Sequence, residues 1–382
     1  MPNGAGRTRE RRARERWAFL SAVGCTDAEI EPIPGDASFR RYFRVRMKMT
    51  ANSEPRSRIL MDAPPEREDV HPFVAIDSLL RRHGFSVPEI LAADPGSGFL
   101  LLEDFGDASF TRLLQKKRQR TALPDEDTLY AAAVDLLAAL GRDIELPIGD
   151  IVRIGWPPAT LAREHAPDDY RLAAYDAEKL RDEARLWIDW YLPLVTGRSC
   201  DDKLLAEFHA LWDPIFTEIE DATGRDAVLV LRDYHADNLM WLSERTGIAR
   251  VGLLDFQDAV IGHPAYDLVS LLHDARRDVP RDLEERMLRR YLDACGRDPA
   301  NFRRLYALLG AQRATKVIGI FSRLARRDGK SRYLKMIPRV WGLLEHSLTL
   351  AGEAALTDFF DHLVAPERRY DIPRLPKEKS AS

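Results

Sequence analysis

Residues 227–258, AVLVLRDYHADNLMWLSERTGIARVGLLDFQD, combine short apolar runs with closely spaced polar side chains. Three runs rich in branched residues predict short strands, and the polar stretch SERTG between the second and third predicts a hairpin turn. Asp233 follows the first strand, Asn238 opens the second, and Asp255 ends the third. Pairing of the last two strands would place Asn238 beside Asp255, with Asp233 on the preceding loop.

These side chains suit phosphoryl transfer. That reaction needs a carboxylate facing the attacking hydroxyl and oxygen ligands that hold Mg²⁺ against the phosphates. The structural alternative is that Asp233 caps a turn and Asp255 is a surface residue at a strand end. Two motifs in the right order and at a workable spacing favour the catalytic interpretation.

The pattern D-x-H-x-x-N followed by L-D-F resembles the catalytic and metal-binding loops of the aminoglycoside-phosphotransferase family, relatives of the protein kinases. The resemblance implies that Asp233 is the catalytic aspartate and that Asn238 and Asp255 bind Mg²⁺. It also implies that His235 supports the loop. Asp267, in the segment GHPAYDL, would be buried and would accept hydrogen bonds from the backbone of the catalytic loop.

The sequence before this stretch predicts a small β-rich lobe. Strands are predicted at 38–47 and 57–62, a helix within 64–85, and two further apolar runs at 86–94 and 98–106, which the turn sequence DPGSG separates. The charged N-terminal segment predicts a partly frayed first helix.

The rest of the chain is predicted to be mainly helical, with helical periodicity at 128–144, 177–195, 201–219 and from about 264 to 360. We therefore expect an α+β, bilobal, protein-kinase-like fold, with a small β-rich N-lobe carrying one long helix and a larger, mostly helical C-lobe. The expected domains are a nucleotide-binding N-lobe at 1–106, a catalytic and acceptor-binding C-lobe at 107–365, and a loose tail at 366–382.

The N-lobe contains the residues expected to bind the nucleotide. A loop with small residues, a hydroxyl and two arginines can approach phosphates, although a plain β-turn has the same pattern. Its candidate residues are Gly35, Asp36, Ser38, Phe39, Arg40 and Arg41. The segment LLEDFG resembles the interlobe hinge of the family, where the backbone around Glu103 and Phe105 would meet the adenine.

One strand departs from the kinase pattern. The sequence ILMD at 59–62 lacks the lysine that kinase-like folds use to contact the α- and β-phosphates. Either Arg40, Arg41 or Arg44 reaches the phosphates instead, or nucleotide affinity is weak, or the chain is a pseudoenzyme that binds without turnover. The intact catalytic set argues against the last option.

Several segments together resemble the bacterial anomeric kinases that act on N-acetylmuramate and N-acetylglucosamine in peptidoglycan recycling: GDASFRRYFR, LMDAPPE, GFLLLEDFGD, LRDYHADNLMWL and GLLDFQDAVIGHPAYDLVSLLHDARRDV. The resemblance implies transfer of the γ-phosphate of ATP, with Mg²⁺, to the C1 hydroxyl of an amino sugar. Three alternatives stay open: a kinase of another alcohol (an aminoglycoside or choline), a nucleotide-binding pseudoenzyme, and a helical interaction protein with a chance motif match.

Acceptor contacts are expected from the large lobe, where an arginine would suit a carboxylate and aromatic rings would suit a sugar. The candidates are Arg153, Trp156, Trp190, Tyr191, Asp258 and His263. Ordinary packing is the alternative for each, and for Trp190 and Tyr191 it is the favoured one.

Composition limits the remaining possibilities. The chain has 382 residues, of which 31% are charged, and a formal net charge of −4, which gives no global case for nucleic-acid binding. Cys25, Cys200 and Cys295 are far apart and form no CxxC, which argues against a disulfide framework or a zinc site and favours a reducing compartment. We expect a cytoplasmic protein with a small-molecule sugar substrate and no nucleic-acid, membrane or obligate protein partner.

Overall fold

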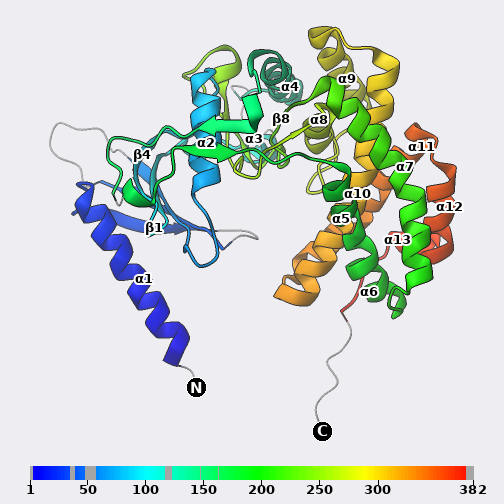
Figure 1. The fold of residues 1–382 in the computed structure, drawn as a ribbon, viewed down its shortest axis with the longest axis horizontal. Coiled ribbons are helices and arrows are strands. Elements are labelled where there is room, and N and C mark those ends of the chain that lie inside the picture. Colours follow the sequence, from blue (N-terminus) through cyan, green and yellow to red (C-terminus); the bar gives the residue numbers. More distant parts are fainter. Residues whose placement is uncertain are drawn as a thin grey trace. The chain divides into compact units, whose positions relative to one another are not determined.

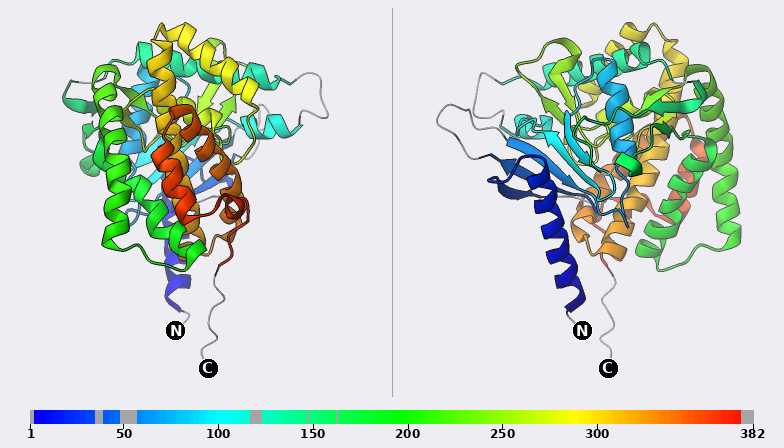
Figure 2. Two further views of the ribbon diagram at one scale, coloured as in Figure 1. Left: turned by 90° about the vertical axis from the view of Figure 1, so that its right-hand side faces the viewer. Right: turned by 60° about the vertical axis from the view of Figure 1, so that its left-hand side comes forward.

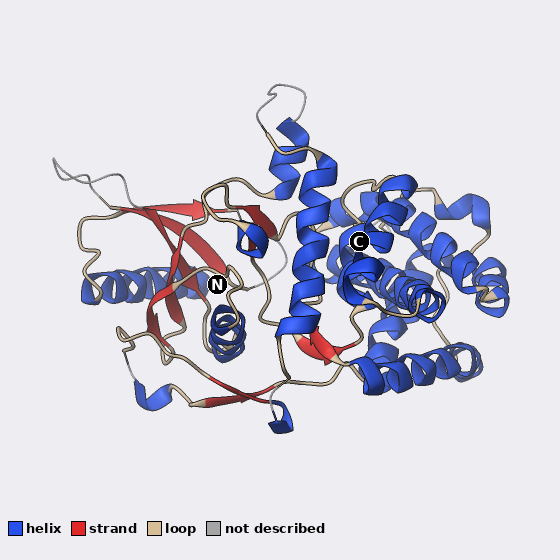
Figure 3. Ribbon diagram, turned by 90° about the horizontal axis from the view of Figure 1, so that it is seen from above, coloured by secondary structure: helices blue, strands red, loops and turns tan. Residues whose placement is uncertain are grey.

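The chain divides into two compact units, and Figure 1 labels most of the helices and some of the strands. The computed structural model describes residues 3–34, 39–47, 57–116, 123–146, 148–161 and 163–375. Unit 1 comprises Met1–Leu123, Pro147–Leu172 and Asp237–Asp258, and unit 2 comprises Pro124–Leu146, Ala173–Ala236 and Ala259–Ser382. The main sheet belongs to unit 1, whereas helices make up most of unit 2 (Figure 3). The predicted α+β class is confirmed.

A five-stranded antiparallel sheet, in the order β1-β2-β3-β5-β4, forms the centre of unit 1. Its strands are β1 (Glu29–Ile33), β2 (Arg41–Arg46), β3 (Ser57–Asp62), β4 (Ile90–Asp94) and β5 (Phe99–Glu103). All except β1 lie within predicted strands or apolar runs. Pro32 interrupts the β1 sequence, and a proline is accommodated there because β1 is an edge strand that pairs with β2 alone.

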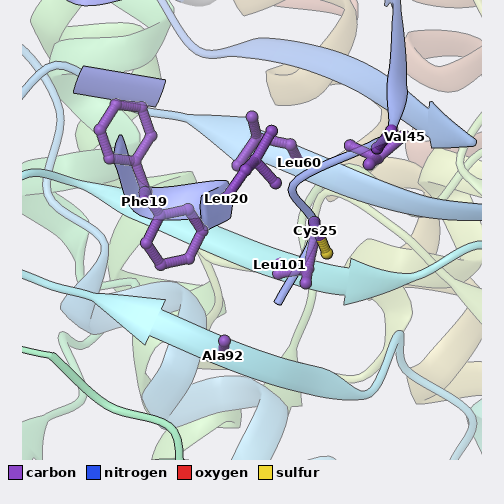
Figure 4. Close-up of a cluster of buried hydrophobic side chains, with 9 residues drawn as sticks. Phe19, Leu20, Cys25, Val45, Leu60, Ala92 and Leu101 are labelled. Carbon is purple, nitrogen blue, oxygen red and sulfur yellow. The ribbon is translucent and has the colours of Figure 1, made fainter. Parts of the chain in front are cut away.

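The C-terminal part of helix α1 (Asn3–Ala22) packs on one face of this sheet (Figure 2, right). Phe19 and Leu20 of the helix are buried with sheet residues in one apolar cluster (Figure 4). The sheet residues of that cluster are Val45, Leu60, Ala92, Phe99 and Leu101, and Cys25 lies among them. Burial of this apolar area is the main force that holds α1 on the sheet.

Ion pairs add to the attachment of α1. The side chain of Asp62, at the end of β3, is 1% exposed. Arg12 donates to it at 2.7 Å, and Arg16 approaches it at 3.5 Å. The Arg12 guanidinium also lies 3.9 Å from the centroid of the Phe99 ring. The buried carboxylate is therefore compensated by two cations, as a buried charge requires.

The other elements of unit 1 are α2 (His71–Arg82), α3 (Phe110–Lys116), the strands β6 (Ile151–Arg153), β7 (Asp169–Arg171), β9 (Leu239–Trp241) and β10 (Val251–Leu253), and the 3₁₀ turns Ile148–Asp150, Arg163–His165 and Gly247–Arg250. In α2 the predicted apolar positions Phe73, Ile76, Leu79 and Leu80 are all buried. Strands β9 and β10 form the predicted hairpin, in which Leu239 pairs with Leu253.

Unit 2 consists of long helices and one short strand pair. The elements are α4 (Glu126–Asp143), α5 (Ala177–Leu186), a π-helical turn (Trp187–Tyr191), α6 (Leu192–Thr196), α7 (Asp202–Asp226), α8 (Ala265–Leu272), α9 (Arg281–Cys295), α10 (Pro299–Asp328), a 3₁₀ segment (Ser331–Met336), α11 (Ile337–Ala351), α12 (Ala354–Leu363), α13 (Pro366–Arg369), and the antiparallel strands β8 (Val228–Val230) and β11 (Val260–Gly262). Helix α10 has twenty buried residues, more than any other described helix. In the described part of the chain, no helix has the length and apolarity to cross a bilayer. The three cysteines are free thiols.

Three segments differ in placement from the sequence-based expectation. Residues 107–123, 147–172 and 237–258 group with unit 1, although the sequence suggested a continuous C-lobe from residue 107. The functional boundaries at 106 and 365 stay predictions. The tail expected to be loose from residue 366 begins with α13, in which Arg369 is 2% exposed because Glu345 and Asp361 bind its guanidinium.

Candidate functional site

The loop that follows β8 presents Asp233 to solvent. Asp233 is exposed, whereas the next three residues, Tyr234, His235 and Ala236, are buried. The Tyr234 hydroxyl donates to the backbone oxygen of Ala133 on α4 at 2.8 Å. The loop is thus fixed from its buried side, and its carboxylate is left accessible.

The backbone just before Asp233 has an unusual conformation. Arg232 has a φ of 68°, in the left-handed region that non-glycine residues rarely adopt. The carboxylate of Asp267 accepts hydrogen bonds from the Leu231 N–H at 2.6 Å and the Arg232 N–H at 2.8 Å, and the Ser270 hydroxyl donates to the Arg232 carbonyl at 3.1 Å. Asp267 therefore makes the contacts that the family resemblance implies. Burial raises its pKa to about 7, against the lowering effect of the two backbone hydrogen bonds.

The Arg232 side chain is held in unit 2 by a charged cluster. Arg232 and the Tyr175 hydroxyl both bind the carboxylate of Glu183 on α5, and Lys316 of α10 lies 2.9 Å from it. Lys316 also donates to the Tyr266 hydroxyl at 3.1 Å. Burial alone would raise the pKa of Glu183, but Lys316 and Arg232 outweigh it and hold the pKa below its usual value. The cluster ties the Asp233 loop to α5 and α10.

His235 occupies a supporting position in the same loop. Its side chain is buried, its backbone N–H donates to the Asp233 carbonyl at 3.1 Å, and its Nε2 lies 3.2 Å from the guanidinium of Arg276. These contacts agree with a structural role.

Asn238 and Asp255 lie together in unit 1, as the predicted hairpin requires. The Leu254 N–H donates to the Asn238 carbonyl at 2.9 Å, and the Asn238 amide nitrogen lies 3.5 Å from Asp255 Oδ2. Gln257 donates to Asp255 Oδ1 at 2.9 Å. Asp255 has a φ of 57°, and the ring of the following residue, Phe256, packs on Phe73 of α2 with centroids 4.8 Å apart. The pair is thus anchored to both the hairpin and α2.

This pair has the donor chemistry of a magnesium site. Carboxylate and amide oxygens are the ligands that Mg²⁺ takes, usually with phosphate oxygens and water completing the shell. Asp255 is exposed and offers two oxygens, and a rotation of the Asn238 amide would present its oxygen to the same point. The residues fit the metal that the sequence implies.

A second set of metal-type ligands lies in unit 2. His273 Nε2 is 2.7 Å and His346 Nε2 3.5 Å from Glu284 Oε1, and all three residues could hold an ion. The Tyr306 hydroxyl also donates to Oε1 at 3.0 Å, and Arg281 binds Oε2 at 2.6 Å. These contacts satisfy both oxygens of the Glu284 carboxylate without a metal ion.

The expected nucleotide loop is described in part. Gly35, Asp36 and Ser38 lie outside the described residues. Phe39 is 53% exposed, and its N–H donates to Glu68 at 3.2 Å. Arg40 forms an ion pair with Glu68 at 3.1 Å. Arg41, the first residue of β2, is exposed.

At the hinge segment, Glu103 ends β5 and binds Arg245 at 2.6 Å. The Arg245 guanidinium lies 5.2 Å from the centroid of the Phe105 ring. A Cβ on Gly252 of β10 would lie 2.8 Å from that ring, so any other residue at this position would displace Phe105. The hinge and the β9–β10 hairpin are therefore in direct contact within unit 1.

Residues 29–308 match the family described as the phosphotransferase enzyme family. This chain belongs to that family. A protein of Caulobacter vibrioides named N-acetylmuramate/N-acetylglucosamine kinase is 39% identical over 384 residues, which cover 92% of this phosphotransferase and 96% of the relative. A protein of Pseudomonas aeruginosa with the same name is 36% identical over 335 residues, 86% of each chain.

Solved structures agree on the fold. A microcompartment-associated aminopropanol kinase aligns with a TM-score of 0.55 and 16% identity, covering 90% of this phosphotransferase and 99% of that chain. The ADP-bound aminoglycoside phosphotransferase APH(2'')-Ib aligns with a TM-score of 0.51 and 14% identity, covering 89% and 99%. The kinase-like fold and the family predicted from the sequence are confirmed.

Two acceptor candidates need correction. Tyr191 is 1% exposed and accepts a hydrogen bond from the Trp341 indole at 2.8 Å, so it belongs to the core of unit 2. His263 is 2% exposed and packs on Phe302. Burial excludes direct contact of both side chains with a sugar in this conformation. Trp190 is half-buried in the π-helical turn.

The other acceptor candidates belong to unit 1. The Trp156 indole donates to the Pro167 carbonyl at 2.8 Å, with its ring edge-on to His71. Arg153 has a side chain that is 80% exposed and lies 3.4 Å from Asp169. Asp258 is exposed and accepts from Gln257 at 3.3 Å. Their roles toward an acceptor stay predictions.

Sequence reasoning missed Tyr42, Glu68, Tyr170 and Gln257, each of which contacts or lies near a candidate residue. Burial raises the pKa of Tyr170, and the charges of Asp258 and Asp69 raise it further, which places this ring near the loop after Asp255. Tyr170 lies on the three-residue strand β7, which is too short for a recognisable pattern. Only Gln257, two residues from Asp255, could have been selected from spacing.

Proposed function

We propose that this phosphotransferase transfers the γ-phosphoryl group of ATP, with Mg²⁺, to the C1 hydroxyl of N-acetylmuramate or N-acetylglucosamine in peptidoglycan recycling. The observation that carries the proposal is an exposed Asp233 on a rigidly held loop, followed by the Asn238–Asp255 pair. The names of the relatives that match over most of their length support the amino-sugar acceptor.

The chemistry follows from the side chains. Asn238 and Asp255 would bind Mg²⁺, which supplies positive charge to the phosphate oxygens when bound. Asp233 orients the sugar hydroxyl and accepts its proton as the new O–P bond forms and the bond to the departing ADP oxygen breaks. The products are the sugar 1-phosphate and ADP. Positioning and charge neutralisation supply most of the rate, and the contacts of Arg232 with Asp267, Ser270 and Glu183 provide the rigidity that positioning requires.

The test is Mg²⁺-dependent ATP consumption with four acceptors: N-acetylmuramate, N-acetylglucosamine, choline and an aminoglycoside. Turnover is expected with the amino sugars, and Asp233→Asn should lower kcat by about 10²- to 10⁴-fold while MgADP binding persists. Asp221→Asn, an exposed carboxylate on α7, is the matched control and should leave kcat unchanged.

Each failure has a distinct meaning. Turnover with choline or an aminoglycoside alone would assign another acceptor to the same site. MgADP binding without turnover of any acceptor would identify a pseudoenzyme. Full activity of Asp233→Asn would remove Asp233 from the mechanism.

A further inference from the structure

Strand β2 carries arginines on the face of the sheet opposite α1, here called the inner face, whereas strand β3 has no cation on that face. In β3, Leu60 points into the cluster beneath α1, so its neighbours Ile59 and Met61 lie on the opposite, inner face. Met61 pairs with Tyr42, and Ile59 pairs with Arg44. Because directly paired residues share a face, Tyr42 and Arg44 also lie on the inner face, and alternation along the chain places Arg40 there as well.

Arg41 lies on the other face. It pairs with Asp62, the carboxylate that Arg12 and Arg16 of α1 bind. Burial lowers the pKa of Arg16, and the charge of Arg41 lowers it further, which places Arg41 on the side of α1. Arg41 therefore cannot serve a ligand on the inner face.

Arg44 is held at the hinge end of the inner face. Its Nε lies 2.7 Å from Asp104, whose side chain is 4% exposed, and its Nη1 lies 3.3 Å from Asp107. Two carboxylates thus compensate one guanidinium. Arg44 therefore connects β2 to the hinge and has a structural role.

Arg40 directly precedes β2, at the other end of that face. Its guanidinium pairs with Glu68 at 3.1 Å, and both side chains are largely buried, at 10% and 14% exposed. Arg40 also hydrogen-bonds the Tyr42 hydroxyl; burial raises the pKa of Tyr42, and the charge of Asp255 raises it further. The segment that carries Glu68 leads into α2, whose Phe73 packs on Phe256, the residue next to Asp255.

We infer that Arg40, oriented by Glu68, is the residue that binds the nucleotide phosphates in place of the missing β3 lysine. This inference rests on the proposed function, because it assumes that a nucleotide binds with its phosphates toward Asp255. A guanidinium can bind two phosphate oxygens at once, and its partner carboxylate fixes its direction. Glu68, which also accepts from the Phe39 N–H, acts as a positioning residue.

The test compares the binding of MgADP and of adenosine by calorimetry. Arg40→Gln should raise the Kd for MgADP by roughly 10- to 100-fold, the value of one charge-assisted hydrogen bond, without changing the Kd for adenosine. Arg40→Lys should lose less, because it keeps the charge. Arg41→Gln, the adjacent arginine on the opposite face, should change neither Kd.

Two further variants separate the alternatives. Glu68→Gln should weaken MgADP binding but leave adenosine binding unchanged, an outcome that a merely structural residue would not produce. Arg44→Gln should affect both ligands alike through the hinge.

Unchanged MgADP binding in both Arg40 variants, with wild-type turnover intact, would overturn the inference alone. A loss confined to MgADP in Arg44→Gln, with Arg40→Gln unaffected, would transfer the role to Arg44. If the wild-type chain binds no MgADP, the proposed function fails and the inference fails with it.

Discussion

Arg232 and Asp255 both have a left-handed backbone, at φ 68° and 57°. Among the non-glycine residues that the structure describes, only Asp150 shares a positive φ. Such a conformation costs on the order of 1–3 kcal/mol and persists only where surrounding contacts enforce it. For Arg232 those contacts are the hydrogen bonds with Asp267 and Ser270 and the ion pair with Glu183. Strain of this kind concentrates at functional sites, and here it adjoins Asp233 and falls on Asp255 itself.

Glu183 is the residue on which this arrangement depends most. Glu183→Gln would leave Arg232 and Lys316, both largely buried, without their shared anion. We expect a loss of about 3 kcal/mol in the free energy of unfolding. Urea unfolding followed by tryptophan fluorescence measures it.

The double variant Glu183→Gln with Lys316→Met should recover part of that loss, because it removes one of the two stranded cations. Glu178→Gln, exposed on the same helix, is the matched control. Equal stability of Glu183→Gln and the wild type would show that the cluster contributes nothing.

The candidate site was predictable where its residues are close in sequence. Asp233, Asn238 and Asp255 fall within 23 residues of one another, and one hairpin joins the last two. Partners from distant segments were not predictable, because nothing in the local sequence indicates the pairing: Glu183 meets Arg232, and Glu68 meets Arg40. The prediction that His263 and Tyr191 contact the acceptor was wrong, because the sequence does not indicate whether a histidine or tyrosine side chain is buried.

At the scale of elements, helix α10 determines the packing of unit 2. It contacts α5, α8 and α11, and the π-helical turn that follows α5. Gly319 allows the closest of these approaches: a Cβ there would lie 2.5 Å from the Leu186 carbonyl oxygen and the Trp187 nitrogen. Because both are backbone atoms, no rotamer change can relieve the clash.

Gly319→Ala should therefore destabilise the protein by about 3 kcal/mol, since α5 would have to move away. Gly342→Ala on α11, where a Cβ meets nothing within 4 Å, should be neutral or stabilising by up to about 1 kcal/mol. Thermal unfolding of the two variants gives the comparison. A smaller loss at 319 than at 342 would contradict this packing.

Elements with long periodic patterns were predicted well, whereas several short or irregular ones were not. Helices α2, α4 and α7 repeat their apolar positions several times, which makes them recognisable. Strands β6, β7 and β11 have three residues each and were not predicted, unlike the equally short β8, β9 and β10, and the π-helical turn Trp187–Tyr191 interrupts a continuous helical pattern. Tertiary pairing, rather than local preference, forms these elements.

At the scale of the whole molecule, stability depends on pH through buried histidine. Burial lowers the pKa of His263 to about 4, from a usual value of 6.5, and the charge of Arg297 lowers it further. Below pH 6.5 the unfolded chain binds a proton that the folded protein does not. Stability is therefore lost as pH falls from 6.5 toward 4, by up to about 3 kcal/mol for this residue.

His263→Asn removes the titration and keeps an acceptor near the Ala265 N–H, which donates to His263 Nδ1 at 3.3 Å. The variant should lose less stability than the wild type between pH 7.5 and 4.5 in urea titrations at both values. Parallel losses in the two proteins would mean that His263 does not carry this dependence.

The placement of α1 on the sheet also has a consequence for the timing of synthesis. Phe19 and Leu20 leave the ribosome before the strands that they cover, the last of which contains Leu101. Synthesis adds ~5–20 residues per second, so the apolar side of α1 stays uncovered for on the order of 4 to 16 seconds while about 80 further residues are made. Its arginines, which later bind Asp62, are hydrated during that interval and oppose premature association. The arginines that hold α1 on the folded sheet thus also oppose association of the newly synthesised helix.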